Sequence, residues 1–156
     1  MSSNPLATSL QHRHIFGVNS DVTNNVSFTT EDLVVYIAGH TIVIYSLTDR
    51  RQRFLNAAEI TDRITAFSSG SGRRLAAVAE YGDRPQVHVF DLRTFRRKKT
   101  ITVGESHSGA KEFVCVSFSE DEQFLVTLSG APDWTLTSWN WAKAKVIAST
   151  QASLSP

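Results

Sequence analysis

The chain has 156 residues, of which 41% are hydrophobic, and its 16 basic and 15 acidic side chains give a formal net charge of +1. These values exclude an intrinsically disordered chain and argue against a strongly polyanion-binding protein. The single cysteine, Cys115, excludes an internal disulfide and favours a reducing compartment. Because Cys115 lies in an alternating apolar run, we expect a small buried side chain rather than a reactive thiol.

Three consecutive units follow a short N-terminal segment, and each unit is predicted to contain four short strands. The first unit has predicted strands at 25–28, 33–38, 41–47 and 53–56. The second has them at 64–68, 74–80, 86–92 and 99–103. The third has them at 113–119, 123–129, 135–141 and 145–150. β-branched and aromatic residues dominate these runs and no segment has a helical period, which predicts an all-β chain.

An aromatic residue closes the third strand of each unit, at Tyr45, Phe90 and Trp139. Their spacing lies near the period of roughly 40–45 residues that is typical of propeller blades. The third unit also contains the sequence SGAPDWTLTSWN at 129–140, which fits the S-G-x-x-D-x-T-[IL]-x-x-W-[DN] core of a WD40 blade. The sequence therefore predicts a WD40-type β-propeller.

The predicted propeller is incomplete, because propellers close with roughly four to eight blades. We expect a flexible N-terminus at 1–10, three blades at about 22–56, 62–103 and 112–150 within a propeller portion 11–150, and a tail at 151–156. Residues 11–17 match a strand that would complete the last blade of a closed ring, and we expect them either to pair with a blade supplied by another chain or to lie unpaired. The rest of a longer protein, or another chain, would have to supply the further blades and cover the apolar flanks.

Candidate catalytic chemistry centres on His107, Ser129 and Asp133, the residue types of a hydrolase triad. Ser129 lies within a predicted strand without a nucleophile elbow, so we expect a structural hydrogen-bond tetrad of these residues with Trp139 instead. In this tetrad the Trp139 indole would donate to Ser129, and His107 would bridge Ser129 and Asp133. We therefore predict no catalytic residues and no enzyme activity.

Metal and cofactor signals are weak. His12 and His14 lack the companion ligands of a zinc site, and the glycine-rich turn at 70–73 lacks the G-K-[ST] sequence of a phosphate-binding loop. No metal, cofactor, nucleic-acid or membrane partner is predicted. We find no secretory signal, and the longest apolar runs are too short to span a bilayer.

Basic residues in the second unit are predicted to gather on one rim of the propeller. This rim comprises Arg73, Arg74, Arg96, Arg97, Lys98 and Lys99. The simpler interpretation is a solvated charged turn. The alternative is a salt-sensitive contact with an acidic surface such as a tubulin tail.

Several short sequences resemble the N-terminal propeller of the cilia- and flagella-associated protein 57 family. They are HIFG at 14–17, VTNNV at 22–26, QRFL at 52–55, and RLA at 74–76 with Glu80 and Pro85 following. The resemblance runs from about residue 11 to residue 150. It implies tandem propellers followed by a coiled coil, a cytoskeletal location in the motile-cilium axoneme, and a non-enzymatic role in placing inner dynein arms on doublet microtubules. The alternative is a cytoplasmic WD40 adaptor outside cilia, and a hydrolase is a distant third.

Overall fold

The computed structural model describes residues 13–56, 63–72, 74–102 and 109–152. The first sheet contains β1 (Val26–Phe28), β2 (Leu33–Ala38), β3 (Thr41–Ser46) and β4 (Arg51–Asn56). The second contains β5 (Ile64–Ser69), β6 (Leu75–Glu80), β7 (Gln86–Asp91) and β8 (Arg96–Thr102). The third contains β9 (Phe113–Phe118), β10 (Phe124–Ser129), β11 (Thr135–Asn140) and β12 (Lys145–Gln151), with the 3-10 turn η1 (Trp141–Lys143) between the last two strands.

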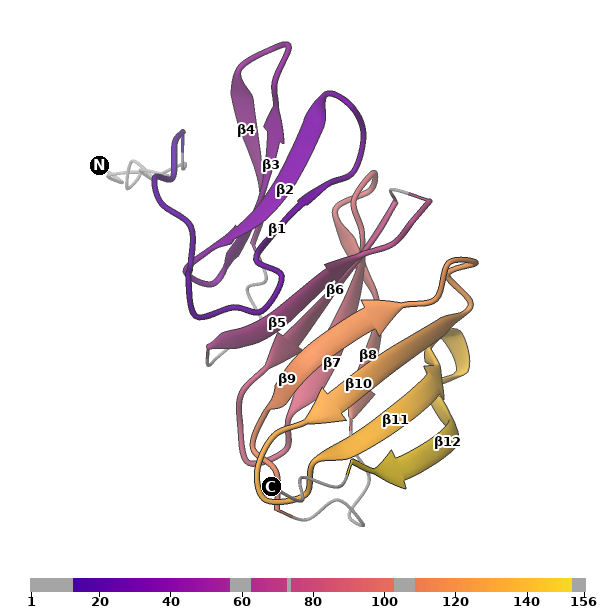
Figure 1. The fold of residues 1–156 in the computed structure, drawn as a ribbon. Helices are drawn as coiled ribbons and strands as arrows, with labels where there is room; N and C mark the ends of the chain where they lie inside the picture. Colours follow the sequence, from indigo (N-terminus) through magenta and orange to yellow (C-terminus); the bar gives the residue numbers. More distant parts are fainter. Residues whose placement is uncertain (1–12, 57–62, 73, 103–108, 153–156) are drawn as a thin grey trace, which may run out of the picture.

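Each sheet is a four-stranded antiparallel meander with its strands in chain order. We call the sheets blade one, blade two and blade three. Figure 1 shows the three sheets arranged in succession, with blade two between the others. Their first strands lie next to one another, since the Thr65 hydroxyl of β5 donates to the Phe113 carbonyl of β9 at 2.8 Å. The fold is an arc of three blades, as expected for an incomplete WD40-like propeller.

All twelve predicted strands are present, and no boundary differs from its prediction by more than three residues. The third strands end at Ser46, Asp91 and Asn140, one residue beyond the aromatic positions. The fourth strands of blades one and two begin earlier than predicted, at Arg51 and Arg96. The residues at which these two strands begin are basic. They can still belong to the strands, because an outermost strand has a hydrogen-bonding partner on only one edge and tolerates charged side chains.

The core lies between the blades rather than within any one of them. One apolar cluster joins blades one and two through residues such as Ile37, Ile42 and Phe67, and a second joins blades two and three through Val87, Leu125 and others. Fully burying one such side chain contributes about 1.5–3 kcal/mol. Packing of one sheet on the next is therefore what stabilises the arc.

Burial along the second strand of each blade shows where the arc ends. All six residues of β6 are buried, because blade two has a neighbour on both faces. In β10, by contrast, buried residues such as Leu125 and Thr127 alternate with half-buried ones such as Val126 and Leu128. Blade three therefore has one covered face and one free face, and Cys115 is half-buried rather than buried because it shares the free face.

The segment before β1 joins blades one and two. Thr23 makes a parallel bridge with Ala66, since its N–H donates to the Thr65 carbonyl at 3.0 Å and its carbonyl accepts from Phe67 at 3.0 Å. The neighbouring Val22 is only 3% exposed and belongs to the first core cluster. Residues 22–26 thus act as a short connector between two blades.

Candidate interaction surface

The Trp139 side chain is buried, as predicted, but its hydrogen bond differs from the prediction. The indole N–H donates to the Thr127 hydroxyl at 2.9 Å, and Trp139 is 3% exposed. The predicted Trp139–Ser129 bond is wrong. Trp139 pairs with Leu125, so Thr127 is its diagonal neighbour on the same face, whereas Ser129 lies four residues, or roughly 13 Å, along the strand.

Ser129 and Asp133 instead bind backbone amides around the turn between β10 and β11. The Ser129 hydroxyl accepts from the Thr135 N–H at 2.8 Å. Asp133 Oδ2 accepts from Gly109 at 3.1 Å and from Ala110 at 3.0 Å, which ties the segment before β9 to this turn. His107 lies outside the described residues, so its predicted bridge stays a prediction. Ser129 and Asp133 both accept hydrogen bonds from backbone N–H groups, and they are not arranged as a nucleophile and a base.

Blade two contains a buried polar network that the sequence interpretation missed. His88 contacts the Glu80 carboxylate through Nε2 at 2.9 Å and the Thr100 hydroxyl through Nδ1 at 3.0 Å. His88 is 2% exposed and Glu80 is 7% exposed, so the network has little access to solvent. It joins β6, β7 and β8 from within, which is the role of a structural network. The sequence signal that could have predicted this network is His88, a single histidine within the apolar run of β7.

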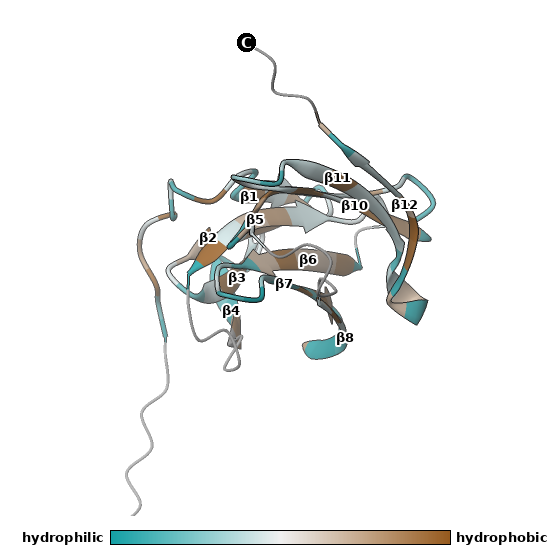
Figure 2. Ribbon diagram, turned by 90° about the horizontal axis from the view of Figure 1, so that it is seen from below, coloured by the Kyte–Doolittle hydropathy of each residue, from teal (hydrophilic) through white to brown (hydrophobic). Residues whose placement is uncertain are grey.

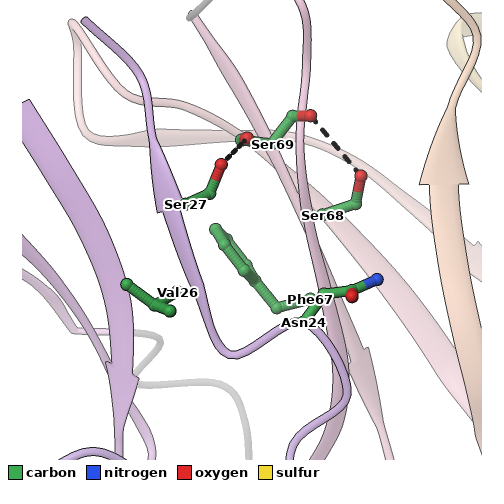
Figure 3. Close-up of a pocket in the computed structure, with 6 residues that line it drawn as sticks. All are labelled: Asn24, Val26, Ser27, Phe67, Ser68 and Ser69. Atoms are coloured by element: carbon green, nitrogen blue, oxygen red, sulfur yellow. Dashed lines mark hydrogen bonds between the residues drawn. The ribbon is translucent and has the colours of Figure 1, made fainter. Parts of the chain in front are cut away.

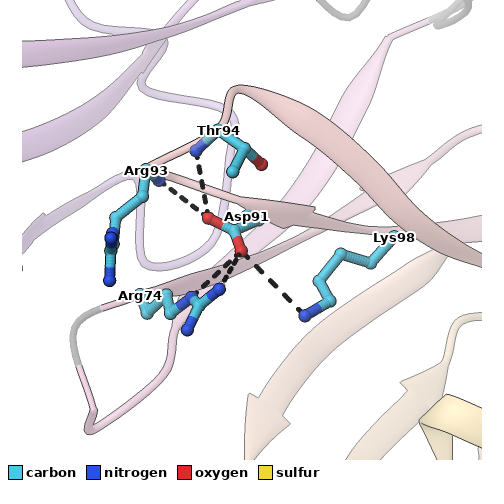
Figure 4. Close-up of polar contacts among 5 residues, drawn as sticks. All are labelled: Arg74, Asp91, Arg93, Thr94 and Lys98. Atoms are coloured by element: carbon cyan, nitrogen blue, oxygen red, sulfur yellow. Dashed lines mark hydrogen bonds and ion pairs between the residues drawn. The ribbon is translucent and has the colours of Figure 1, made fainter.

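The basic rim has a buried acidic group beneath it (Figure 4). Asp91 lies at the end of β7, and its Oδ2 lies 2.9 Å from Arg74 Nη2 and 4.0 Å from Lys98 Nζ. Its Oδ1 accepts from the backbone N–H groups of Arg93 at 2.9 Å and Thr94 at 3.1 Å. Burial alone would raise the pKa of Asp91, but these hydrogen bonds and the Arg74 guanidinium more than offset it and lower the pKa to about 2.

Asp91 therefore changes the expected character of the rim. Arg74 and Lys98 converge on one carboxylate, which neutralises part of their charge. Arg96 and Arg97 are exposed and Lys99 is half-buried, all on β8. Arg73 lies outside the described residues. In the described part of the rim, the basic residues other than Arg74 and Lys98 therefore all lie on β8.

An acidic turn of blade three contacts the glycine-rich turn of blade two. The Gly72 N–H donates to Glu122 Oε1 at 2.7 Å, and the Ser71 hydroxyl donates to the Glu120 carbonyl. A Cβ atom at Gly70 would overlap the Glu122 carboxylate, so a larger residue there would require the Glu122 side chain to move. The glycine-rich turn thus contacts a neighbouring blade.

A shallow hollow of about 250 Å³ lies between β1 and β5 (Figure 3). It is lined by Asn24, Val26, Ser27, Phe67, Ser68 and Ser69. The Ser27 and Ser69 hydroxyls lie 2.6 Å apart and join the two first strands. The lining contains no acidic or basic side chain, so its hydroxyls have no general base beside them.

The N-terminal segment lies against the face of blade one that is turned away from blade two. Residues 13–17 are not in a strand, which agrees with the unpaired alternative over this range; Gln11 and His12 lie outside the described residues. The Gln52 side chain accepts from the Ile15 N–H at 2.8 Å and donates to the Ile15 carbonyl at 2.9 Å. Gln52 also donates to the Tyr36 hydroxyl at 2.8 Å, while burial raises the pKa of Tyr36. The Gln52 side chain thus holds the Ile15 backbone against blade one.

Within the described residues, no group of three or more His, Cys, Asp or Glu side chains is placed to hold a metal ion. His14 stacks on Phe16 with ring centroids 5.9 Å apart. Over the same part of the chain, no helix is long and apolar enough to cross a membrane.

The fold and these contacts define the class of the protein as a three-blade portion of a WD40-like propeller. The chain is 29% identical over 143 residues to mouse cilia- and flagella-associated protein 57, which covers 91% of this chain and 11% of the relative. It is 27% identical over 152 residues to Tetrahymena thermophila cilia- and flagella-associated protein 57 C, covering 92% of this chain and 12% of the relative. Mouse cilia- and flagella-associated protein 44 is 24% identical over 89% of this chain and 7% of its own length.

These relatives share a name that places them in cilia and flagella, and the chain spans only about a tenth of the length of the first two. No protein-family model matches the chain.

Proposed function

We propose that this chain is a non-enzymatic scaffold portion of the motile-cilium axoneme. The observation that carries the proposal is its similarity to cilia- and flagella-associated protein 57 over nine-tenths of the chain, on a fold built from repeated blades. The polar contacts support a structural role, since Ser129 and Asp133 hold backbone amides. Scaffold propellers present rims and faces to several partners, which suits an ordered assembly.

The finer role that we propose is the placement of inner dynein arms on the doublet microtubule. It rests on the sequence resemblance described above. The three blades at about 22–56, 62–103 and 112–150 would then form part of a larger ring, with 1–10 outside it. The predicted tail would begin later than residue 151, because β12 includes Gln151. Further blades would come from the rest of a longer protein or from another chain.

Exposed apolar side chains on the outer faces of blades one and three support the proposal of further blades. On blade one, Val26 and Phe28 are 53% and 66% exposed, and on blade three Leu136 is 42% exposed. These three residues lie on the outward faces of blades one and three. The other face of each blade packs toward blade two. Apolar sheet faces of this kind are normally covered by another sheet.

The start of β8 is our candidate contact for an acidic partner, with the C-terminal tails of tubulin as the proposed ligand. Arg96 and Arg97 are exposed there, while Asp91 holds Arg74 and Lys98. Because exposed charges are screened by salt over about 10 Å at 0.1 M, attachment through this rim should weaken as salt rises.

Cosedimentation with microtubules tests the rim. We expect Arg96→Glu with Arg97→Glu to reduce binding about tenfold at low salt, a loss of about 1.4 kcal/mol. Lys143→Glu with Lys145→Glu, in the equivalent turn of blade three, is the matched control and should have a smaller effect. Microtubules whose acidic tails have been removed by protease should bind the unchanged chain weakly. Equal binding to intact and tailless microtubules would contradict this contact.

Localisation tests the broader proposal and separates it from the adaptor alternative. An epitope-tagged chain, within its full-length protein where it is part of one, should concentrate along cilia in a ciliated cell. A diffuse cytoplasmic signal in cells with normal cilia would favour the adaptor and contradict the axonemal role.

A further inference from the structure

The outer strand of blade three differs from the outer strands of the other two blades. Every residue of β12 is exposed, and Val146 and Ile147 are 40% and 53% exposed. Its only charged residue is Lys145, at one end. By comparison, β8 begins with four consecutive basic residues and β4 contains two arginines. Figure 2 shows the same contrast, with teal on β8 and brown along part of β12.

Charged residues on an edge strand are a common protection against pairing with another chain. β8 and β4 have this protection, and β12 lacks it over residues 146–151. β8 and β12 both carry a register shift near their starts, so irregularity does not distinguish the two edges. The difference between them is the chemistry of their side chains.

The hydrogen-bonding direction of β12 shows which backbone groups are available. The Ala152 N–H donates inward to the Trp134 carbonyl at 2.7 Å, and the register with β11 is unbroken from Ala148 to Gln151. In an antiparallel ladder the inward-pointing groups recur at every second residue. Ala148 and Thr150 therefore point toward β11, and the N–H and carbonyl groups of Ser149 and Gln151 point outward. No described strand pairs with this outer edge.

We propose that β12 is a pairing edge for the β12 strand of a second copy of this chain, in the antiparallel direction. Antiparallel pairing places the two Lys145 side chains at opposite ends of the joint strand pair, roughly 20 Å apart, so the charges do not repel. The remaining six residues on each strand are uncharged and rich in β-branched side chains, which favours pairing. Two β8 strands placed in the same way would carry eight basic residues along one strand pair, with the two Lys99 side chains side by side at its centre.

This surface is distinct from the free faces of blades one and three. A further blade would pack against a sheet face, whereas the outer edge of β12 lies at the perimeter of the arc. Pairing through β12 would therefore join two propellers side by side, and it goes beyond the scaffold role without depending on it.

Amide hydrogen exchange followed by NMR on the full chain tests the proposal at single residues. The Ser149 and Gln151 amides should exchange rapidly in dilute solution and become protected as the protein concentration rises. The Thr150 amide, which points toward β11, should be protected throughout. Association through the free faces would leave Ser149 and Gln151 rapidly exchanging, so the two kinds of association can be told apart.

A substitution supplies the second arm. Ser149→Pro removes an outward donor, which an edge strand tolerates, and should raise the dimer dissociation constant by at least about tenfold in sedimentation equilibrium. The control is Thr137→Val, because the Thr137 and Ser149 hydroxyls lie 3.1 Å apart and both variants remove that contact. Thr137→Val should leave the dimer intact. The proposal is overturned if Ser149→Pro leaves dimerisation unchanged, or if the unaltered chain stays monomeric at the concentrations used for NMR.

Discussion

The hydrogen bond between Trp139 and Thr127 can be tested by a double-mutant cycle. Trp139→Ala should cost about 3–5 kcal/mol, because it leaves a cavity between blades two and three. Thr127→Val keeps the shape of the side chain but leaves the buried indole N–H without an acceptor, which should cost about 1–3 kcal/mol. Thr127 is 1% exposed, so water cannot easily replace the lost partner.

The cycle itself uses Trp139→Phe and Thr127→Val, with urea unfolding followed by far-ultraviolet circular dichroism. The double variant should be less destabilised than the sum of the two single variants by about 1 kcal/mol, because neither partner is then left unpaired. The control is Trp139→Phe combined with Ser129→Ala, which should be additive within about 0.5 kcal/mol. Additivity for Thr127 together with coupling for Ser129 would refute the hydrogen bond described here.

Two further changes test the contacts that fix the turns. Gly109→Ala should destabilise the chain by about 1–3 kcal/mol, because its Cβ would lie 2.8 Å from Pro132 Cγ; a thermal melt that matches the unaltered chain would contradict the close packing. Asp91 should contribute stability above its ordinary pKa of 3.8, and that contribution should be lost as the pH falls toward the folded-state pKa of about 2. Asp91→Asn should therefore cost on the order of 2 kcal/mol at neutral pH and little at pH 2, as measured by urea unfolding at both pH values. An equal cost at both pH values would contradict a role for the ionised carboxylate.

The strands could be predicted from the sequence because each one ends at a strong turn signal and alternates or clusters its apolar residues. The aromatic positions Tyr45, Phe90 and Trp139 identified the third strands to within one residue. Only β4 and β8 began earlier than expected. Their first residues are basic, and hydrophobic pattern alone cannot show that a charged segment still pairs along one edge.

The polar contacts were harder to predict, because they depend on how residues face one another across strands. Ser129 and Thr127 both lie on β10, and only the register with β11 shows which one the Trp139 indole reaches. Asp91 was missed as the group that holds Arg74 and Lys98. Arg74 lies 17 residues before Asp91 and meets it because two turns emerge at the same end of blade two, whereas Lys98 follows Asp91 across the turn between β7 and β8.

The central claim, a scaffold built into the axoneme, is tested most directly by fractionating cilia. Cilia would be treated with detergent to remove the membrane and soluble matrix, and the doublet microtubules sedimented and probed with an antibody against residues 13–152. We predict that the chain, with any longer protein that contains it, stays with the doublets after detergent and is released by high salt. Its complete release with the detergent-soluble matrix would contradict the account.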